Sequence, residues 1–196
     1  MVLVALALVA CDDGRAATEP PPEARFTIDT GRLDEPYRNG ELGISFRPPV
    51  GWQPLEPGQR DLVAAALLDV QADGRYRLQL VDLFLRTETL SFAAISRVTR
   101  DGAPVADLRA YVDEYEQLLV PPEEDQLRAR THFTVNGIDV TQIRHMQGGR
   151  ISFTLVFTAP DGNVVQLNYS IPPAAYEDEG VKLESSVGTI MHLQVS

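Results

Sequence analysis

Residues 128–171, RARTHFTVNGIDVTQIRHMQGGRISFTLVFTAPDGNVVQLNYSI, consist of four apolar-rich segments separated by three short turn sequences. The turns are Asn136-Gly137, Gly148-Gly149 and Asp161-Gly162-Asn163. Asn-Gly between alternating apolar residues is a strong hairpin signal and is typical of a type I′ turn. We therefore predict a four-stranded antiparallel meander, with strands over residues 128–135, 138–146, 151–159 and 164–171. In this register Val135 pairs with Ile138, and His132 pairs with Thr141.

Helical patterns flank the meander on both sides. The first lies within residues 104–120, where six apolar or aromatic residues form one stripe at helical spacing: Leu108, Tyr111, Val112, Tyr115, Leu118 and Leu119. Pro104 favours the first turn, Asp107 complements the helix dipole, and Pro121-Pro122 ends the helix. The second pattern, over residues 174–193, predicts a C-terminal helix packed on the sheet. Its apolar positions are Tyr176, Leu183, Val187, Ile190 and Met191.

The first half of the chain favours strands. Residues 25–29 and 42–47 alternate apolar and polar residues, and residues 92–98 form a further candidate strand. Asp73-Gly74 lies between apolar segments 62–71 and 75–86, which predicts a hairpin. The first arm is ambiguous between helix and strand, and the turn favours strand. The second arm places Leu78 and Leu80 on one face, with Leu83 and Leu85 following after a shift at Asp82. The order of strands, helix, meander and helix predicts an α+β fold, an antiparallel β-sheet flanked by helices.

One segment carries a resemblance to a known family. Gly43-Ile44-Ser45-Phe46-Arg47-Pro48-Pro49-Val50-Gly51-Trp52 runs from an apolar strand through prolines to Gly-Trp. Together with the helix around 105–112, the Asn136-Gly137 turn and the closing Ser185-Ser186-Val187, it resembles the PsbP-like family in its broad sense. That family includes photosystem II extrinsic proteins and bacterial lipoproteins of the DcrB and LpqN kind. The resemblance spans roughly residues 26–193. It implies an α-β-α sandwich around an antiparallel sheet, and no shared catalytic residue.

The N-terminus predicts a lipid anchor. Residues 1–10 are entirely apolar and precede Cys11, the only cysteine of the chain, which is followed by Asp12-Asp13. This order is typical of a bacterial lipoprotein signal peptide, although no Lys or Arg precedes the apolar run, so we expect the signal peptide to be truncated. The alternative is a short apolar N-terminus with an incidental cysteine. Residues 11–25 then form the lipidated Cys11 and a Pro-rich tether, and residues 26–196 form one globular domain.

Composition excludes several kinds of function. With 28 acidic and 17 basic residues the formal net charge is −11, which argues against nucleic-acid binding. A single cysteine excludes an internal disulfide, and the sequence contains no HExxH, GxSxG or phosphate-binding glycine motif. The predicted register does not place His132 and His145 opposite each other, so a shared metal is not expected. We therefore predict no catalytic residues, no metal and no cofactor.

These observations lead to two expectations about function. The first is a non-catalytic lipoprotein of the bacterial cell envelope, anchored to a membrane through Cys11 and facing the periplasm or the exterior, which binds an envelope protein. The alternative is a carrier of a small ligand, a lipid or a glycan, held in a cleft between sheet and helix. Candidate contacts for a ligand or partner are Trp52, Tyr111 and Tyr115, while core packing is the competing role for each.

Overall fold

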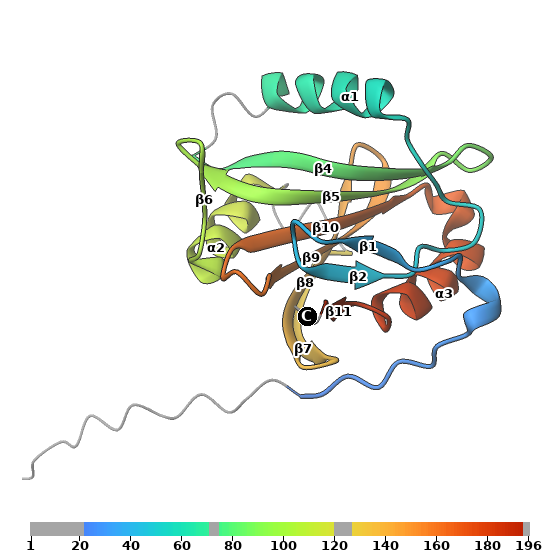
Figure 1. Ribbon diagram of the computed structural model, residues 1–196. Helices are drawn as coiled ribbons and strands as arrows, with labels where there is room; N and C mark the ends of the chain where they lie inside the picture. The colour runs from blue at the N-terminus through green and yellow to red at the C-terminus, as the bar shows by residue number, and fades with distance from the viewer. Residues whose placement is uncertain (1–21, 71–74, 120–126, 194–196) are drawn as a thin grey trace, which may run out of the picture.

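The computed structural model of the protein describes residues 22–70, 75–119 and 127–193 and confirms the predicted fold class (Figure 1). An eight-stranded antiparallel sheet has the strand order β3-β4-β5-β10-β9-β8-β7, with β6 pairing to β5. A smaller sheet has the order β1-β2-β11. Within the described residues, no helix is long and apolar enough to cross a membrane.

The bounds of the elements follow in chain order. The first half contains η1 (Thr30–Arg32), β1 (Tyr37–Asn39), β2 (Ile44–Phe46), β3 (Gln53–Pro54), α1 (Pro57–Val70), β4 (Arg77–Arg86), β5 (Ser91–Arg100) and β6 (Ala103–Pro104). The second half contains α2 (Leu108–Leu118), β7 (Ala129–Val135), β8 (Ile138–Gln147), β9 (Arg150–Thr158), β10 (Val164–Ile171), η2 (Pro173–Ala175), α3 (Tyr176–Val187) and β11 (Met191–His192).

The meander, β7 to β10, matches its prediction in strand number, turns and register. Val135 pairs with Ile138, and His132 pairs with Thr141. Asn136 and Gly137 have φ angles of 49° and 78°, the positive values that both central residues of a type I′ turn require. The meander joins the rest of the sheet through β10, which pairs antiparallel with β5.

Strand β4 contains the shift that its sequence predicts. A β-bulge lies between Leu80 and Asp82, so Leu80 pairs with Ser96 while Leu83 pairs with Ala94. A β-bulge places one extra residue in one strand of an antiparallel pair, which changes the face on which the following side chains lie. The leucines before and after the bulge therefore lie on the same face of the sheet.

The segment before β4 corrects the predicted hairpin. Residues 57–70 form helix α1, which packs along β4, whereas the sequence favoured a strand over residues 62–71. Pro57 occupies the first helical position, and the Ala64-Ala65-Ala66 run has the highest helix propensity of any residue type. The high helix propensity of these residues therefore explains why the ambiguous segment forms a helix and not a strand. The Asp73-Gly74 turn lies outside the described residues.

Three further predictions require correction at their boundaries. Helix α2 begins at Leu108 rather than Pro104, because Pro104 lies in β6 and pairs with Thr99 of β5. Asp107 is the N-cap, and its carboxylate accepts the backbone N–H of Ala110 at 3.0 Å. The C-terminal helix spans only Tyr176–Val187, and β11 follows it. Residues 25–29 form no strand. Pro121-Pro122, where the helix now called α2 was predicted to end, lies outside the described residues.

Helices cover both faces of the large sheet, as the sandwich expectation implied. One face packs against α3 and the small sheet, and its core includes Trp52, Phe157, Leu167, Leu183 and Val187. The other face packs against α2, and its smaller core includes Val98, Val112, Val156 and Val164. Most side chains of β9 and β10 are buried on both faces, so polar residues such as Thr154 and Gln166 are buried beside the apolar ones.

Candidate binding groove

A groove of about 820 Å³ lies between α2 and the sheet face formed by β4, β5 and β10. Its volume falls within the roughly 300–1,000 Å³ typical of small-molecule sites. The groove exists because α2 covers only part of this face, with its core contacts towards Val98 and Val164. Over the remainder, apolar side chains of β4 and β5 line the groove, and Val63 of α1 lines it as well.

The sheet side of the groove is largely aliphatic. Leu78, Leu83 and Leu85 of β4 line it, as do Phe92 and Ala94 of β5. The bulge in β4 is what keeps the leucines from both halves of that strand on this face. Ala94, which carries only a methyl group, lies on this floor between Leu83 of β4 and Asn168 of β10.

Two aromatic rings of α2 form the opposite wall. Tyr111 and Tyr115 line the groove, and their rings lie 6.0 Å apart. The Tyr111 hydroxyl donates to Oε1 of Gln166 on β10, and the Tyr115 hydroxyl shares a 3.1 Å hydrogen bond with Oγ1 of Thr154 on β9. Burial raises the pKa of both phenols above the ordinary value of 10. The hydroxyls thus fix α2 to the sheet, while the rings remain as an apolar wall.

Polar groups follow one line along the floor and end at a cation. Gln166, Asn168 and Ser170 alternate along β10 and all face the groove, and Arg150 lies at the Ser170 end. The Arg150 guanidinium donates from Nε to Ser170 Oγ at 2.8 Å, and from Nη2 to the carbonyls of Ser170 and Leu90 at 3.0 and 2.5 Å. Its Cζ lies 5.3 Å from the centroid of the Phe92 ring. The groove therefore combines apolar walls with one cationic end.

Trp52 lies on the other side of the sheet and is not part of the groove. It is 1% exposed, and its ring meets that of Tyr169 edge-on with centroids 5.9 Å apart. The structure thus brings Tyr111 and Tyr115 together and separates them from the third candidate. The sequence could not show this, because Trp52 precedes β3 and the face on which it lies depends on pairing with distant strands.

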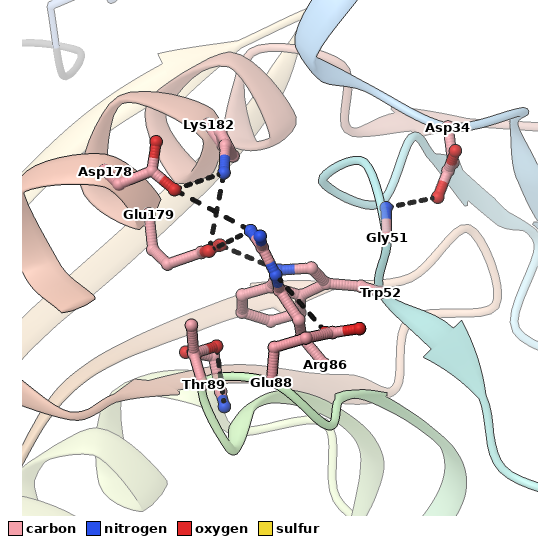
Figure 2. A network of polar contacts seen from close by, with 10 residues as sticks. Asp34, Gly51, Trp52, Arg86, Glu88, Thr89, Asp178, Glu179 and Lys182 are labelled. Atoms are coloured by element: carbon pink, nitrogen blue, oxygen red, sulfur yellow. Dashed lines mark hydrogen bonds and ion pairs between the residues drawn. The ribbon is translucent and has the colours of Figure 1, made fainter.

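A cluster of charged residues surrounds the Trp52 indole (Figure 2). Glu179 of α3 is fully buried and accepts hydrogen bonds from Trp52 Nε1 at 2.9 Å, from Arg86 Nη1 and from Lys182 Nζ at 3.4 Å. Lys182 also contacts Asp178 at 2.6 Å, and this contact lowers the pKa of Asp178. The buried Glu179 thus has two cations as partners, and these also contact the exposed carboxylates Asp178 and Glu88; a buried charge requires such partners.

The cluster joins three parts of the chain that are distant in sequence. Arg86 ends β4, Trp52 precedes β3, and Glu179 lies in the first turn of α3. Glu177, Asp178 and Glu179 occupy the first turn of α3, where negative charge is favourable. The burial of Glu179 had no local signal, since an acid in a first turn is ordinarily solvated.

The comparisons with known proteins give structural neighbours only. No family model matches the chain, and no curated protein matches it. Among solved structures, the chain is similar to cyanobacterial PsbP (CyanoP) from Synechocystis sp. PCC 6803, with a TM-score of 0.49 and 12% identity over 86% of this chain and 97% of that chain. A protein from Bacteroides thetaiotaomicron is similar with a TM-score of 0.44 and 11% identity, over 82% of this chain and 48% of that chain. The fold class given above rests on the strand pairing and helix placement of this chain itself.

The remaining sequence candidates lie apart from the groove or outside the described residues. His132 shares a 3.0 Å hydrogen bond with Thr141, and His145 is fully buried with its ring edge-on to Tyr115. Across residues 22–70, 75–119 and 127–193, no group of three or more His, Cys, Asp or Glu side chains could hold a metal ion. Cys11, the predicted lipidation site, lies outside the described residues.

Proposed function

We propose that this protein binds a small apolar molecule in the groove between α2 and the sheet, and that it is a carrier rather than an enzyme. The observation that carries the proposal is the groove of about 820 Å³ with walls of leucine, phenylalanine and tyrosine side chains. Each methylene group that a ligand buries there contributes about 0.8 kcal/mol, less the cost of ordering the ligand. Of the two functions expected from the sequence, the small-ligand carrier is thus the better supported.

The second candidate is the protein-binding module. It is favoured by Leu118, which lines the groove and is 72% exposed, and by Leu62 of α1, which is 74% exposed. Large apolar side chains exposed to solvent favour contact with a protein partner. A protein partner would contact these exposed side chains, whereas a small molecule would be buried against the groove floor, so substitution of a floor residue tests the carrier.

Filling the groove floor is expected to abolish ligand binding. Ala94→Trp adds an indole on the groove floor, and Ala94→Leu adds a smaller group. We expect the affinity for a neutral apolar probe, N-phenyl-1-naphthylamine, to fall by a few-fold for leucine and by more than about tenfold for tryptophan, because overlap removes burial of several methylene-sized groups. Fluorescence titration of the purified full chain measures both affinities.

The matched control is Thr131→Trp, which places the same indole on an exposed position of the edge strand β7. Its probe affinity should equal that of the unaltered protein, and circular dichroism should show that all three variants are folded. Binding of the probe to Ala94→Trp with unaltered affinity would contradict the proposed site. Failure of the unaltered protein to bind the probe would contradict the carrier proposal.

We further propose that the carrier is held at a membrane of the cell envelope through lipidated Cys11. The apolar run before Cys11 and the Pro-rich segment after it support this anchor. Expression with a Lys/Arg-containing segment added before Met1, in a bacterium that processes lipoproteins, should give a membrane-bound form whose intact mass corresponds to cleavage before Cys11 plus diacyl or triacyl modification. Cys11→Ser should release the protein from the membrane fraction, and an unacylated wild-type mass would contradict the anchor.

A further inference from the structure

Arg150 is held in place before any ligand binds. Its guanidinium donates three hydrogen bonds to Ser170 and Leu90, and it lies over the Phe92 ring. Fixing a long side chain by contacts of this kind removes most of the ordering cost that binding would otherwise carry. The side chain is half-buried at one end of the groove, so it lies where a ligand ends rather than along its body.

The charge of Arg150 is not neutralised by the protein around it. Its recorded partners are a hydroxyl and two carbonyl oxygens, and no Asp or Glu carboxylate of the described residues lies within ion-pair distance of it. By contrast, Arg86 and Arg130 both contact carboxylates. These hydrogen bonds use Nε and Nη2, which leaves Nη1 for a group in the groove. Burial lowers the pKa of Arg150, which is consistent with a cation removed from water without a paired anion.

The two ends of the groove differ in charge. Glu114 lines the groove and forms an ion pair with Arg75 at 3.4 Å, on the side where Tyr76 and Leu78 lie. Arg150 and Phe92 mark the other side. Leu78 and Leu85 pair with residues of β5 that are six positions apart, so the apolar floor extends about 20 Å along the strands. A ligand with one anionic end would be oriented with that end at Arg150 and its apolar body towards Leu78.

We infer that the ligand of the groove is an amphiphile with an anionic oxygen headgroup, a carboxylate or a phosphate monoester, which is bound by Arg150. This inference rests on the proposed function, because it names the chemical class of the ligand that the apolar groove takes. Carboxylate and phosphate oxygens are the groups that a guanidinium recognises best, and a charge-assisted hydrogen bond is about twice as strong as a neutral one. The protein as a whole has a formal net charge of −11 and therefore repels anions. Attraction of an anion to the groove must then come from the local charge of Arg150.

The test is displacement of the neutral probe from the full chain by dodecanoate, dodecyl phosphate and dodecanol. We expect both anionic ligands to bind at least about tenfold more tightly than dodecanol. Arg150→Gln should remove that advantage and leave the affinities for dodecanol and for the probe within about twofold, since the apolar walls remain. Arg150→Lys should keep part of it, because the charge is retained without the planar fork.

Arg100→Gln is the matched control, because Arg100 is exposed at the far end of β5 and is not part of the groove. It should leave all three affinities unchanged. Acetate and inorganic phosphate should not displace the probe, and displacement by them at equal concentration would show a simple anion site and overturn the inference. Equal affinity for dodecanol and dodecanoate, unaltered by Arg150→Gln, would overturn the inference while leaving the proposed function intact. If neither dodecanol nor the probe binds, the proposed function itself fails.

Discussion

Glu179→Ala is expected to lower the free energy of unfolding by about 3–5 kcal/mol, the usual cost of removing one partner of a buried ion pair. The Glu179 side chain has no exposed surface, while those of Lys182 and Arg86 are 9% and 23% exposed. Its removal leaves the Trp52 indole N–H buried without an acceptor and leaves two cations with only the exposed carboxylates Asp178 and Glu88. Urea unfolding followed by circular dichroism measures the loss.

The neighbouring residue Glu177 supplies a matched control on the same helix. It is exposed and lies in the same first turn, so Glu177→Ala should change the stability by no more than about 0.5 kcal/mol. Glu179→Gln should fall between the two, because the amide keeps an acceptor for the indole but removes the negative charge. A loss below about 1 kcal/mol for Glu179→Ala would contradict the structural role assigned to the cluster.

The parts of the fold that were predicted correctly have local signals. The Asn136-Gly137 turn requires two positive φ angles, and this requirement determines the register of β7 and β8. The stripe from Leu108 to Leu119 predicts which face of α2 meets the sheet, because apolar residues at helical spacing lie on one face; Tyr111 and Val112 of this stripe are buried, whereas Leu118 at its end is exposed. The shift at Asp82 was visible because a bulge changes the phase of alternating residues.

The errors occurred where the pattern was ambiguous or where pairing partners are distant. The apolar segment from 62 to 71 is compatible with a strand or a helix, and a turn signal beside it favoured the wrong choice. Pro104 suits the first turn of a helix, but it also suits a short edge strand, where its missing N–H costs nothing. Only the pairing of β6 with β5 distinguishes these cases, and no local spacing encodes that pairing.

The candidate site was predictable only in part. Tyr111 and Tyr115 were found because a helix repeats its face every three to four residues. Arg150 had no signal, since an arginine after a Gly-Gly turn is ordinary, and its importance comes from strands β5 and β10 that bring Phe92 and Ser170 against it. Trp52 was placed among the ligand contacts because aromatic type is visible in a sequence, whereas the face of the sheet on which it lies is not.

The two faces of the sheet therefore serve separate purposes. The face towards α3 is closed by a well-packed core and a buried charge cluster, while the face towards α2 leaves a groove whose walls are held by hydrogen bonds at the tyrosine tips. Substitutions on the first face should change stability without changing ligand affinity, and substitutions on the groove floor should do the reverse.

Trp52→Ala provides the strongest test of this separation. We expect it to lower the free energy of unfolding by about 3–5 kcal/mol, because it removes a fully buried indole and its contact with Tyr169, and it leaves Glu179 with one donor fewer. Urea unfolding by circular dichroism gives the loss, since Trp52 is the only tryptophan of the chain and its fluorescence disappears with it. Trp52→Phe should cost less, since the ring is partly retained and mainly the hydrogen bond to Glu179 is lost.

For either variant, the affinity for the neutral probe, measured in the absence of urea where the variant remains folded, should match that of the unaltered protein within about twofold. A tenfold loss of probe affinity in folded Trp52→Phe would show that Trp52 contributes to the binding site from the opposite face, and the assignment of separate purposes to the two faces would be wrong.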